Sequence, residues 1–421
     1  MVQKSVTMAK DQRYNLLYIF TISIITLSKL ANCYTCDTSD DWLNVTQLET
    51  WPNGVVKYKL HASLTLRDTT EVQNAFEEFH TKTCIRFEPW QEGDLDFVSI
   101  EVNNSVCGAA NVCKIGGYQV VQFGKDCRSK ANIVHQLGHT LCLGDEHQRP
   151  DRDLHLNFSS CADDLIPGKI ESYGFPMGIY DYASQMHSEC GSCQGGWATD
   201  GYVEKCGQQI SAGLSVLDVD KLNSLYNCQG CQRHRWVPAA SLSSRDYPNV
   251  KTFGYESRNA TPIYVCRAFL REQVTSGMYD ESTKTCKLPW GYKAYDVQDQ
   301  VEVLTIPGGT IGADCSSYQL KNWRDADISS FVNVGTRLTI IDSIHVAYSS
   351  FNTGSGEMEK FVGNVRFPTG NLRAEFPVGT EGLITPDYQA QFSGPIGNAA
   401  FEYGAVNFKL ILATIRLKSF G

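Results

Sequence analysis

The sequence predicts an α+β domain in the first half of the chain, followed by an all-β region. Two patterns indicate helices early in the chain: apolar side chains recur with helical spacing over 69–81, and His135 and His139 are spaced to share one helix face. From about residue 338, apolar side chains alternate instead, as they do in half-buried strands. The 421 residues are enough for two or three domains that each bury a core.

Charge and cysteine content limit the class of protein. The chain has a formal net charge of −9 and contains no basic block, which argues against a nucleic-acid partner. Its 16 cysteines are typical of a protein that folds in an oxidising compartment. We therefore expect a secreted, extracellular protein. N-glycosylation sequons fit that compartment and occur at Asn44, Asn103, Asn157 and Asn259.

Residues 1–33 have the pattern of a secretory signal peptide. Basic residues precede an apolar run over 16–27, and small residues then offer a cleavage site. The run is shorter than the ~20 apolar residues that cross a bilayer, so no membrane span is predicted. Cleavage after Ala31 keeps every cysteine in the mature chain, whereas cleavage after Cys33 leaves one thiol unpaired. A short acidic segment, 34–50, follows.

A strand and a helix open the α+β domain. The apolar residues within 55–60 predict a partly buried strand. Over Thr69–Thr81, the side chains of Val72, Phe76 and Phe79 fall on one face of a helix.

His135 and His139 are the strongest chemical signal in the chain. Because they are four residues apart on a predicted helix, both imidazoles leave the same face and can bind one metal ion. Pairs with this spacing also occur on helices that bind no metal. The motifs around the pair decide between the two interpretations.

The surrounding segment resembles the zinc-binding helix of the astacin metallopeptidases. The window 133–152 reads IVHQLGHTLCLGDEHQRPDR, in register with the family motif HExxHxxGxxHE and the Arg-x-Asp-Arg run that follows it. The sequence WPNGV from Trp51 resembles the start of that domain, and LDVDKLNSLYNC at 217–228 resembles its closing helix. The resemblance covers residues 51–228. It implies an α+β metzincin fold, a zinc ion and peptidase activity.

A second motif lies further along the chain. Residues 180–187, YDYASQMH, resemble the Met-turn of the family, in which a methionine, here Met186, lies beneath the metal and supports its ligands. Two motifs in the right order argue against a chance pair of histidines.

Three positions tied to catalysis differ from the family pattern. Gln136 replaces the glutamate that takes a proton from metal-bound water, and the loss of a general base typically costs ~10² to 10⁴ in rate. Asp145 replaces the third histidine ligand, and a carboxylate there is expected to loosen the site and make bound water less acidic. Ser188 replaces the tyrosine after the Met-turn. These changes predict weak or absent peptidase activity.

Two other side chains compete with Asp145 as third metal ligand. Cys142 replaces the glycine at which the family's helix ends, and because a residue with a Cβ resists the left-handed conformation of such a stop, the helix is expected to run on. Cys142 then shares the face of the histidines. His147 reaches the site only if the helix is two residues longer and a deletion before Arg149 compensates. Asp145 is the choice that needs no gap.

The resemblance also implies disulfides. It pairs Cys84 with Cys228 and Cys107 with Cys127, and each bridge is expected to stabilise the fold by ~2–4 kcal/mol. The CGSC sequence at 190–193 has the spacing of a redox or metal motif. No βαβ pattern surrounds it, so structural disulfides are expected there instead.

The second half of the chain begins with a different resemblance. The stretch IYVCRA at 263–268 resembles the core of a natterin-type repeat, in a module expected to span 233–305 with Cys266 and Cys286 bridged. Members of that family are associated with carbohydrate binding and defence, so the resemblance implies carbohydrate binding through 236–305. The alternative is a small β-module that packs beside the peptidase-like domain.

Residues 306–421 carry no recognisable motif. Alternating apolar residues with Gly-rich turns between them predict an all-β sandwich. No cysteine follows Cys315, so this segment is expected to depend on its apolar core alone.

The sequence thus supports a secreted zinc metalloendopeptidase of impaired activity. His135, His139 and Asp145 are the expected zinc ligands, and Gln136 is expected to orient the bound water. The alternative is a catalytically silent pseudoprotease whose cleft binds an extracellular protein or peptide. A third hypothesis is a lectin-like defence protein centred on residues 236–305.

Overall fold

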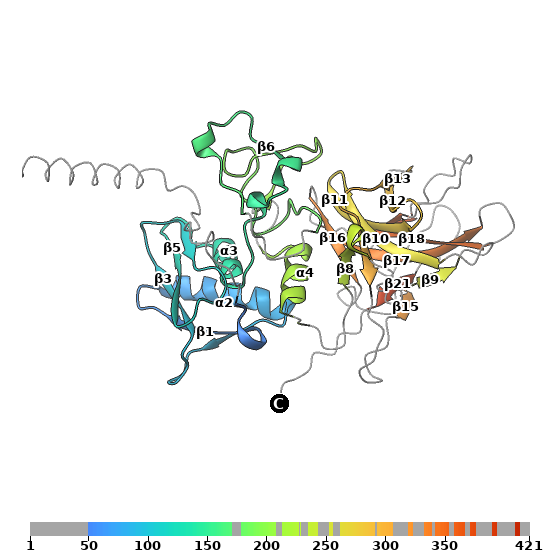
Figure 1. Ribbon diagram of the computed structural model, residues 1–421. Helices are drawn as coiled ribbons and strands as arrows, with labels where there is room; N and C mark the ends of the chain where they lie inside the picture. Colours follow the sequence, from blue (N-terminus) through green and yellow to red (C-terminus); the bar gives the residue numbers. More distant parts are fainter. Residues whose placement is uncertain are drawn as a thin grey trace, which may run out of the picture.

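The computed structural model contains an α+β domain and a β-rich region that lie side by side (Figure 1). The predicted signal peptide, most of the acidic segment and the sequons at Asn44 and Asn259 lie outside the described residues. The structure describes residues 49–170, 178–207, 213–226, 228, 235–242, 252–255, 262–290, 293–305, 319–322, 332–338, 342–352, 358–366, 371–375, 390–393 and 409–412.

The α+β domain is built on a five-stranded sheet with the order β2-β1-β3-β5-β4. Its strands are parallel except for the edge strand β4, which runs antiparallel to β5. The strand expected over 55–60 is confirmed as β1. The five strands are β1 (Val55–Leu60), β2 (Arg86–Pro89), β3 (Phe97–Val102), β4 (Gly108–Ala110) and β5 (Tyr118–Phe123).

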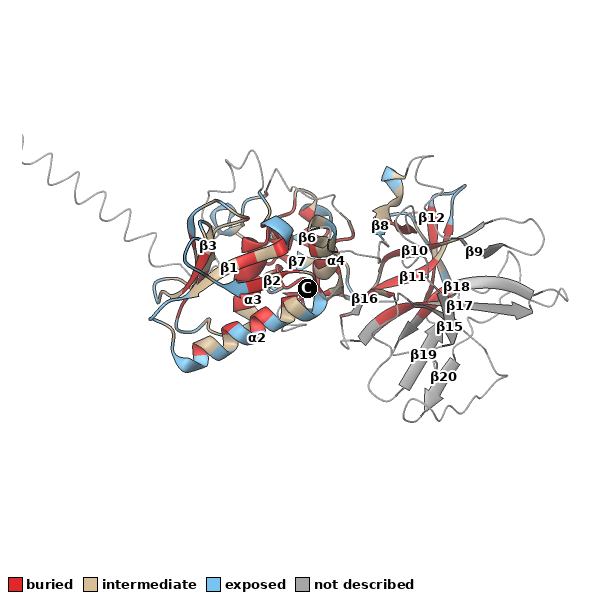
Figure 2. Ribbon diagram, turned by 90° about the horizontal axis from the view of Figure 1, so that it is seen from below, coloured by how far each residue is buried: buried red, intermediate tan, exposed pale blue. Residues whose placement is uncertain are grey.

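Helix α2 (Leu66–Lys82) packs its apolar face into the core of this domain, where Val72 and Phe79 are fully buried. The helix begins before the predicted Thr69 because a capping box precedes it. The Thr65 side chain accepts a hydrogen bond from the backbone of Asp68, and the Asp68 carboxylate accepts one from the backbone N–H of Thr65. Figure 2 shows the buried residues gathered where the helices face the sheet.

Helix α3 (Lys130–Thr140) carries the histidine pair and ends earlier than expected. Cys142 has a φ of 73°, and the N–H groups of Cys142 and Leu143 donate to carbonyls in the last turn of the helix, which is a Schellman motif. The expectation that the helix continues past Cys142 is therefore wrong. A disulfide from Cys142 to Cys113 and the two hydrogen bonds hold the cysteine in a conformation that costs a residue with a Cβ ~1–2 kcal/mol.

Between α3 and α4 (Val216–Leu225) the chain is rich in loops, as predicted. Both cysteines of the CGSC sequence form structural disulfides, Cys193 with Cys161 and Cys190 with Cys206. The short elements of this segment are η3 (Glu146–Gln148), η4 (Arg152–Leu154), β6 (Leu156–Asn157), η5 (Asp163–Leu165) and β7 (Trp197–Ala198).

The second half of the chain forms a 14-stranded sheet, which confirms the expected all-β region. Strands from the predicted repeat module and from the segment after residue 306 belong to this same sheet, because β16 pairs with β11. Both segments are called the β-region below. Its strands are β8 (Arg235–Pro238), β9 (Thr252–Tyr255), β10 (Pro262–Leu270), β11 (Gln273–Asp280), β12 (Thr285–Trp290), β13 (Lys293–Val297), β14 (Glu302–Thr305), β15 (Gln319–Asn322), β16 (Asn333–Arg337), β17 (Asp342–Asn352), β18 (Met358–Arg366), β19 (Asn371–Glu375), β20 (Ala390–Ser393) and β21 (Lys409–Leu412).

Apolar packing continues from the α+β domain into the β-region. Ile179 and Leu217 share one buried cluster with Val265, Val274 and Leu304 of the strands. The region around the Met-turn is therefore covered by the second half of the chain. Within the described residues, no helix has both the length and the apolar character to cross a membrane.

Candidate metal centre

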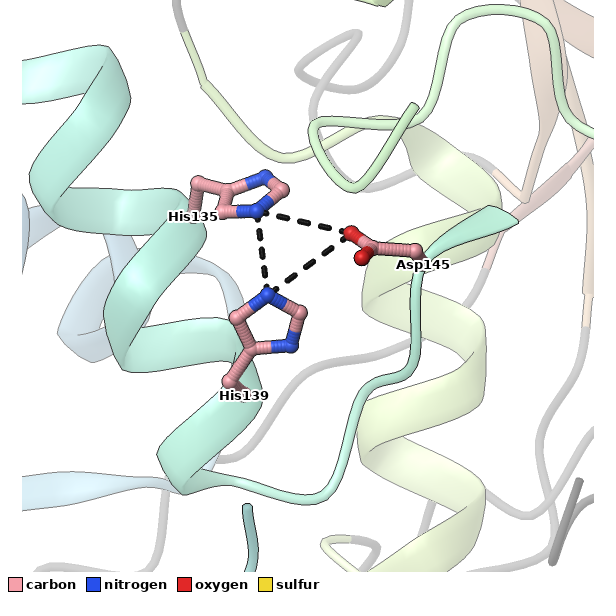
Figure 3. Close-up of side chains that lie close together, drawn as sticks. All are labelled: His135, His139 and Asp145. Atoms are coloured by element: carbon pink, nitrogen blue, oxygen red, sulfur yellow. Dashed lines mark hydrogen bonds and ion pairs between the residues drawn. The ribbon is translucent and has the colours of Figure 1, made fainter. Parts of the chain in front are cut away.

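Helix α3 presents His135 and His139 to one side, where Asp145 meets them (Figure 3). Ser129 begins the helix by accepting a hydrogen bond from the backbone of Asn132. The Nε2 atoms of the two histidines are 3.0 Å apart. Asp145 Oδ1 lies 3.5 Å from Nε2 of His135 and 3.6 Å from Nε2 of His139. Among the described residues, these three form the one group of His, Cys, Asp and Glu side chains that could hold a metal ion.

Backbone carbonyls orient both imidazole rings. Nδ1 of His135 lies 2.9 Å from the carbonyl oxygen of Gln185, and Nδ1 of His139 lies 2.9 Å from that of Leu143. Because a carbonyl oxygen only accepts, each neutral ring carries its proton on Nδ1 and has a lone pair on Nε2. The two lone pairs face one another, an arrangement that a cation between them stabilises.

Burial keeps the three side chains uncharged when no metal binds. Burial lowers the pKa of His135, and burial and the nearby His135 hold the pKa of His139 well below its ordinary value. Burial also raises the pKa of the Asp145 carboxyl to about 8. The Oδ1 atom of Asp145 is buried and has no hydrogen-bond partner, a condition that costs free energy unless a ligand satisfies it.

This donor set fits a zinc ion. Zinc accepts imidazole nitrogens and carboxylate oxygens, and three protein ligands with a fourth position left open are typical of its catalytic sites. The candidate ligand atoms all lie within 4.8 Å of one another. Because the ligands must be deprotonated, binding would release the proton from Asp145.

The structure separates the other two candidate ligands from the histidine pair. Cys142 is bonded to Cys113 and has no thiol to offer. His147 turns toward Ser188, whose hydroxyl lies 3.2 Å from its Nε2 atom and whose backbone N–H donates to its Nδ1 atom over 3.2 Å. Asp145 is therefore the side chain that joins the pair.

Gln136 and Met186 take the two remaining predicted positions around α3. Gln136 packs against β4, since a Cβ on Gly108 would lie 2.5 Å from its Nε2 atom. Met186 packs against α3 at Gly138, where an added Cβ would lie 2.6 Å from the Met186 sulfur. The Met-turn thus packs against the helix that carries the histidine pair, and the neutral amide of Gln136 follows His135.

Buried polar contacts that sequence analysis did not identify hold the Met-turn in place. Asp218 of α4 accepts hydrogen bonds from the Ser184 hydroxyl at 2.6 Å and from the Gln185 N–H at 2.8 Å. The N–H of Glu146 donates to the Met186 carbonyl at 3.1 Å. Asp218 also completes the capping box of α4, which is the signal that could have identified it.

The three disulfides that the resemblances implied are all present, and two predicted sequons lie in the described part of the chain. Asn157 is exposed, whereas Asn103 is half-buried and donates to Gln122 Oε1 over 3.1 Å. The bridges join Cys84 to Cys228, Cys107 to Cys127 and Cys266 to Cys286.

Comparison with known families matches two parts of the chain. The model of the astacin peptidase family matches residues 44–227, and that of the DM9 repeat matches residues 257–331. The first match confirms the resemblance to astacins. The second overlaps the predicted repeat module and extends beyond residue 305.

Curated relatives and solved structures match the same astacin segment. The chain is 34% identical over 195 residues to zinc metalloproteinase nas-14 of Caenorhabditis elegans, covering 42% of this chain and 37% of that protein. It is 30% identical over 204 residues to nas-6 of the same organism, covering 46% of this chain and 58% of that protein. The matches therefore span about half the length of these relatives, or less.

Among solved structures, the hatching enzyme zinc-protease HCE-1 of Oryzias latipes matches with 23% identity and a TM-score of 0.37, covering 46% of this chain and all of that one. Myroilysin matches with 18% identity and a TM-score of 0.34, covering 43% of this chain and 97% of its own.

Proposed function

We propose, from the astacin domain at residues 44–227, that this chain binds one zinc ion and hydrolyses peptide bonds poorly. His135, His139 and Asp145 are the proposed ligands. The observation that carries the proposal is the convergence of two unprotonated Nε2 atoms and an unpartnered, buried carboxylate oxygen within 3.0 to 3.6 Å of one another. Without a cation, the two facing Nε2 lone pairs and the buried, unpartnered Oδ1 atom each cost free energy.

Impaired hydrolysis follows from the side chains around the ligands. Bound zinc would supply a Lewis acid and an acidified water. The amide of Gln136 has no basic oxygen to take a proton from that water, and the amide is confined against Gly108. The Ser188 hydroxyl, at the position of the family's tyrosine, is directed to His147. Gln136 therefore supplies no general base, and Ser188 does not take over the role of the tyrosine.

We also propose that the protein is secreted. Six disulfides join residues of the described part of the chain, which favours an oxidising compartment. The signal-peptide pattern of residues 1–33, with basic residues before an apolar run and small residues after it, also supports export. Detection of the processed, glycosylated protein in the medium of expressing cells would support this proposal, and retention of an unprocessed chain in the cytosol would contradict it.

Zinc analysis together with a casein-cleavage assay tests the main proposal. The purified full chain is expected to hold about one zinc ion per molecule and to cleave casein slowly. Gln136→Glu is expected to raise the rate by ~10² to 10⁴ with the zinc content unchanged. The control is Gln136→Glu combined with His139→Ala, which must lose both zinc and activity and so excludes a contaminating protease. Rapid cleavage by the wild type would contradict impairment, and a zinc-free wild type would contradict the metal site.

The alternative is a silent pseudoprotease that binds an extracellular protein or peptide in the cleft. The neutral Gln136 favours this alternative as well. Turnover by the wild type that does not exceed that of His139→Ala, together with zinc-dependent retention of an inhibitor peptide, would support the silent form. Measurable zinc-dependent turnover would support the weak hydrolase.

Carbohydrate binding by the β-region is a second candidate function. Arg271 lies among aromatic side chains, with its guanidinium 3.1 Å from the Tyr295 hydroxyl and 4.6 Å from the centroid of the Tyr202 ring. Aromatic faces beside polar donors are common in ligand sites. Glycan-array binding that Arg271→Ala abolishes would support this candidate, and an array without signal for the full chain would contradict it.

A further inference from the structure

A loop of the β-region reaches into the astacin domain beside the Met-turn. Gln300, between β13 and β14, has a φ of 46°, so this residue turns the chain sharply. Its Oε1 atom accepts a hydrogen bond from the backbone N–H of Tyr180 at 2.8 Å. Its Nε2 atom donates to His155 Nε2 at 2.9 Å and lies 3.3 Å from Asp151 Oδ2. One amide side chain thus contacts three residues of the other domain.

Tyr180, the first residue of the Met-turn segment 180–187, connects the Gln300 contact to the last residue of that segment. Its hydroxyl lies 2.8 Å from Nε2 of His187, and Nδ1 of His187 lies 2.5 Å from the carbonyl oxygen of Ser188. The carbonyl can only accept, so Nδ1 holds the proton of the neutral ring and Nε2 accepts from the tyrosine hydroxyl. Tyr180 and His187 are both buried. The direction of each hydrogen bond is therefore defined.

The Met-turn in turn positions two of the three candidate metal ligands. The Gln185 carbonyl accepts from Nδ1 of His135 and directs its Nε2 atom into the site. The Met186 carbonyl accepts from the N–H of Glu146, the residue that follows Asp145. A shift of the turn would move both ligands.

The interface around Gln300 is close-packed. The rings of Tyr182 and Phe269 lie 5.3 Å apart across it. A Cβ on Gly178 would overlap a carboxylate oxygen of Glu302, so the two segments approach as closely as glycine allows.

Two ion pairs of the buried Arg267 add to this packing. Arg267 of β10 donates to Glu302 and to Asp220 of α4, each at 2.7 Å. The Arg267–Asp220 pair joins the β-region to the closing helix of the astacin domain. Loss of the Gln300 contacts alone is therefore expected to leave the two domains docked.

We propose that Gln300 is a positioning residue for the metal centre. Acting through Tyr180 and His187, it sets the place of the Met-turn and so the alignment of His135 and Asp145. Through Gln300, the β-region then helps to position the ligands of the metal site. This inference rests on the proposed binding of zinc.

Zinc affinity of the full chain tests the inference. Gln300→Met keeps the side-chain length and removes both polar atoms, and it is expected to weaken zinc binding about 10-fold in competition with a chelator, the lower end of the effect of residues that orient ligands. Gln298→Met is the matched control, because Gln298 lies exposed in the same loop and is expected to leave the affinity unchanged. Cobalt in place of zinc gives a second readout, since its visible spectrum is expected to shift in Gln300→Met and to stay unchanged in Gln298→Met.

Tyr180→Phe keeps the backbone N–H that reaches Gln300 and removes the hydroxyl that reaches His187. It is expected to weaken zinc binding in the same range, and the double variant with Gln300→Met is expected to be little weaker than either single variant. Should Gln300→Met fail to fold, the zinc affinity and the cobalt spectrum of Tyr180→Phe test the inference in its place. Variants that match Gln298→Met in affinity and spectrum would overturn the inference while wild-type zinc binding stands. A wild type without zinc would overturn the proposed function itself.

Discussion

The ammonium group of Lys221 lies 2.5 Å from Oε2 of the buried Glu146. This ion pair connects α4 to the segment that carries the third candidate ligand, and Arg149 completes it at 2.7 Å from Oε1. Burial alone would raise the pKa of Glu146, but Lys221 and Arg149 outweigh burial and lower the pKa to about 2. Glu146 is therefore ionised at neutral pH and needs both cations.

Lys221→Met is expected to lower the free energy of unfolding by about 3 kcal/mol, because it leaves a buried carboxylate short of one cation. The folded-state pKa of Glu146 lies below its unfolded value of about 4.5, so its contribution is present above that pH and is lost as the pH falls toward 2. In Lys221→Met the folded-state pKa of Glu146 lies closer to the unfolded value, so the loss is smaller and ends at a higher pH. Urea unfolding from pH 3 to 7 measures both effects, with the surface pair variant Lys57→Met as a control that changes little. Equal stability of the two variants would show that the buried pair contributes nothing.

The third ligand can be identified by a pair of alanine variants. Asp145→Ala is expected to weaken zinc binding more than ~100-fold, because it removes a ligand, whereas His147→Ala is expected to stay within ~10-fold, because His147 contacts Ser188 instead. Chelator competition on both purified variants provides the comparison. The reverse ranking would assign the ligand to His147.

The buried carboxyl of Asp145 predicts a pH dependence of the metal-free protein. Its folded-state pKa of about 8 lies above the ordinary 3.8, so the folded state binds the proton more tightly and loses stability as the pH rises between these values. Relative to Asp145→Asn, the wild type in a chelator is expected to lose up to about 1.4 kcal/mol per pH unit, levelling off near pH 8. Thermal unfolding of both proteins from pH 5 to 9 checks this. A constant difference across the range would mean that Asp145 is ionised and paired without metal.

Cys142 allows disulfide loss and backbone strain to be separated. Cys142→Ala and Cys142→Gly both remove the bridge to Cys113, but only glycine relieves the left-handed backbone at φ 73°. The glycine variant is expected to be more stable than the alanine variant by about 1 kcal/mol. This difference is the relief of backbone strain minus the cost of the greater conformational entropy of glycine in the unfolded chain. Urea unfolding of both variants gives the difference. An alanine variant of equal stability would mean that the helix end rearranges once the bridge is gone.

The sequence by itself determined the local chemistry of this protein. The spacing of His135 and His139 placed both imidazoles on one helix face. The register of the two motifs marked Gln136, Asp145 and Ser188 as the changed positions. Strand β1 could be predicted to the residue, because the apolar and β-branched residues that favour a strand are close together in the sequence. Such features depend on contacts within a few positions of the chain.

Only the tertiary structure decided which distant groups meet. Asp145 joins the histidine pair, and Cys142 and His147 do not, because α3 ends at Thr140. The disulfide from Cys142 to Cys113 holds Cys142 in the left-handed conformation at this helix end, which a residue with a Cβ otherwise disfavours. The contact of Gln300 with Tyr180 joins residues 120 positions apart, and no local pattern encodes it. Packing between distant segments selects such contacts, because the free energy of burial depends on the whole assembled core rather than on neighbouring residues.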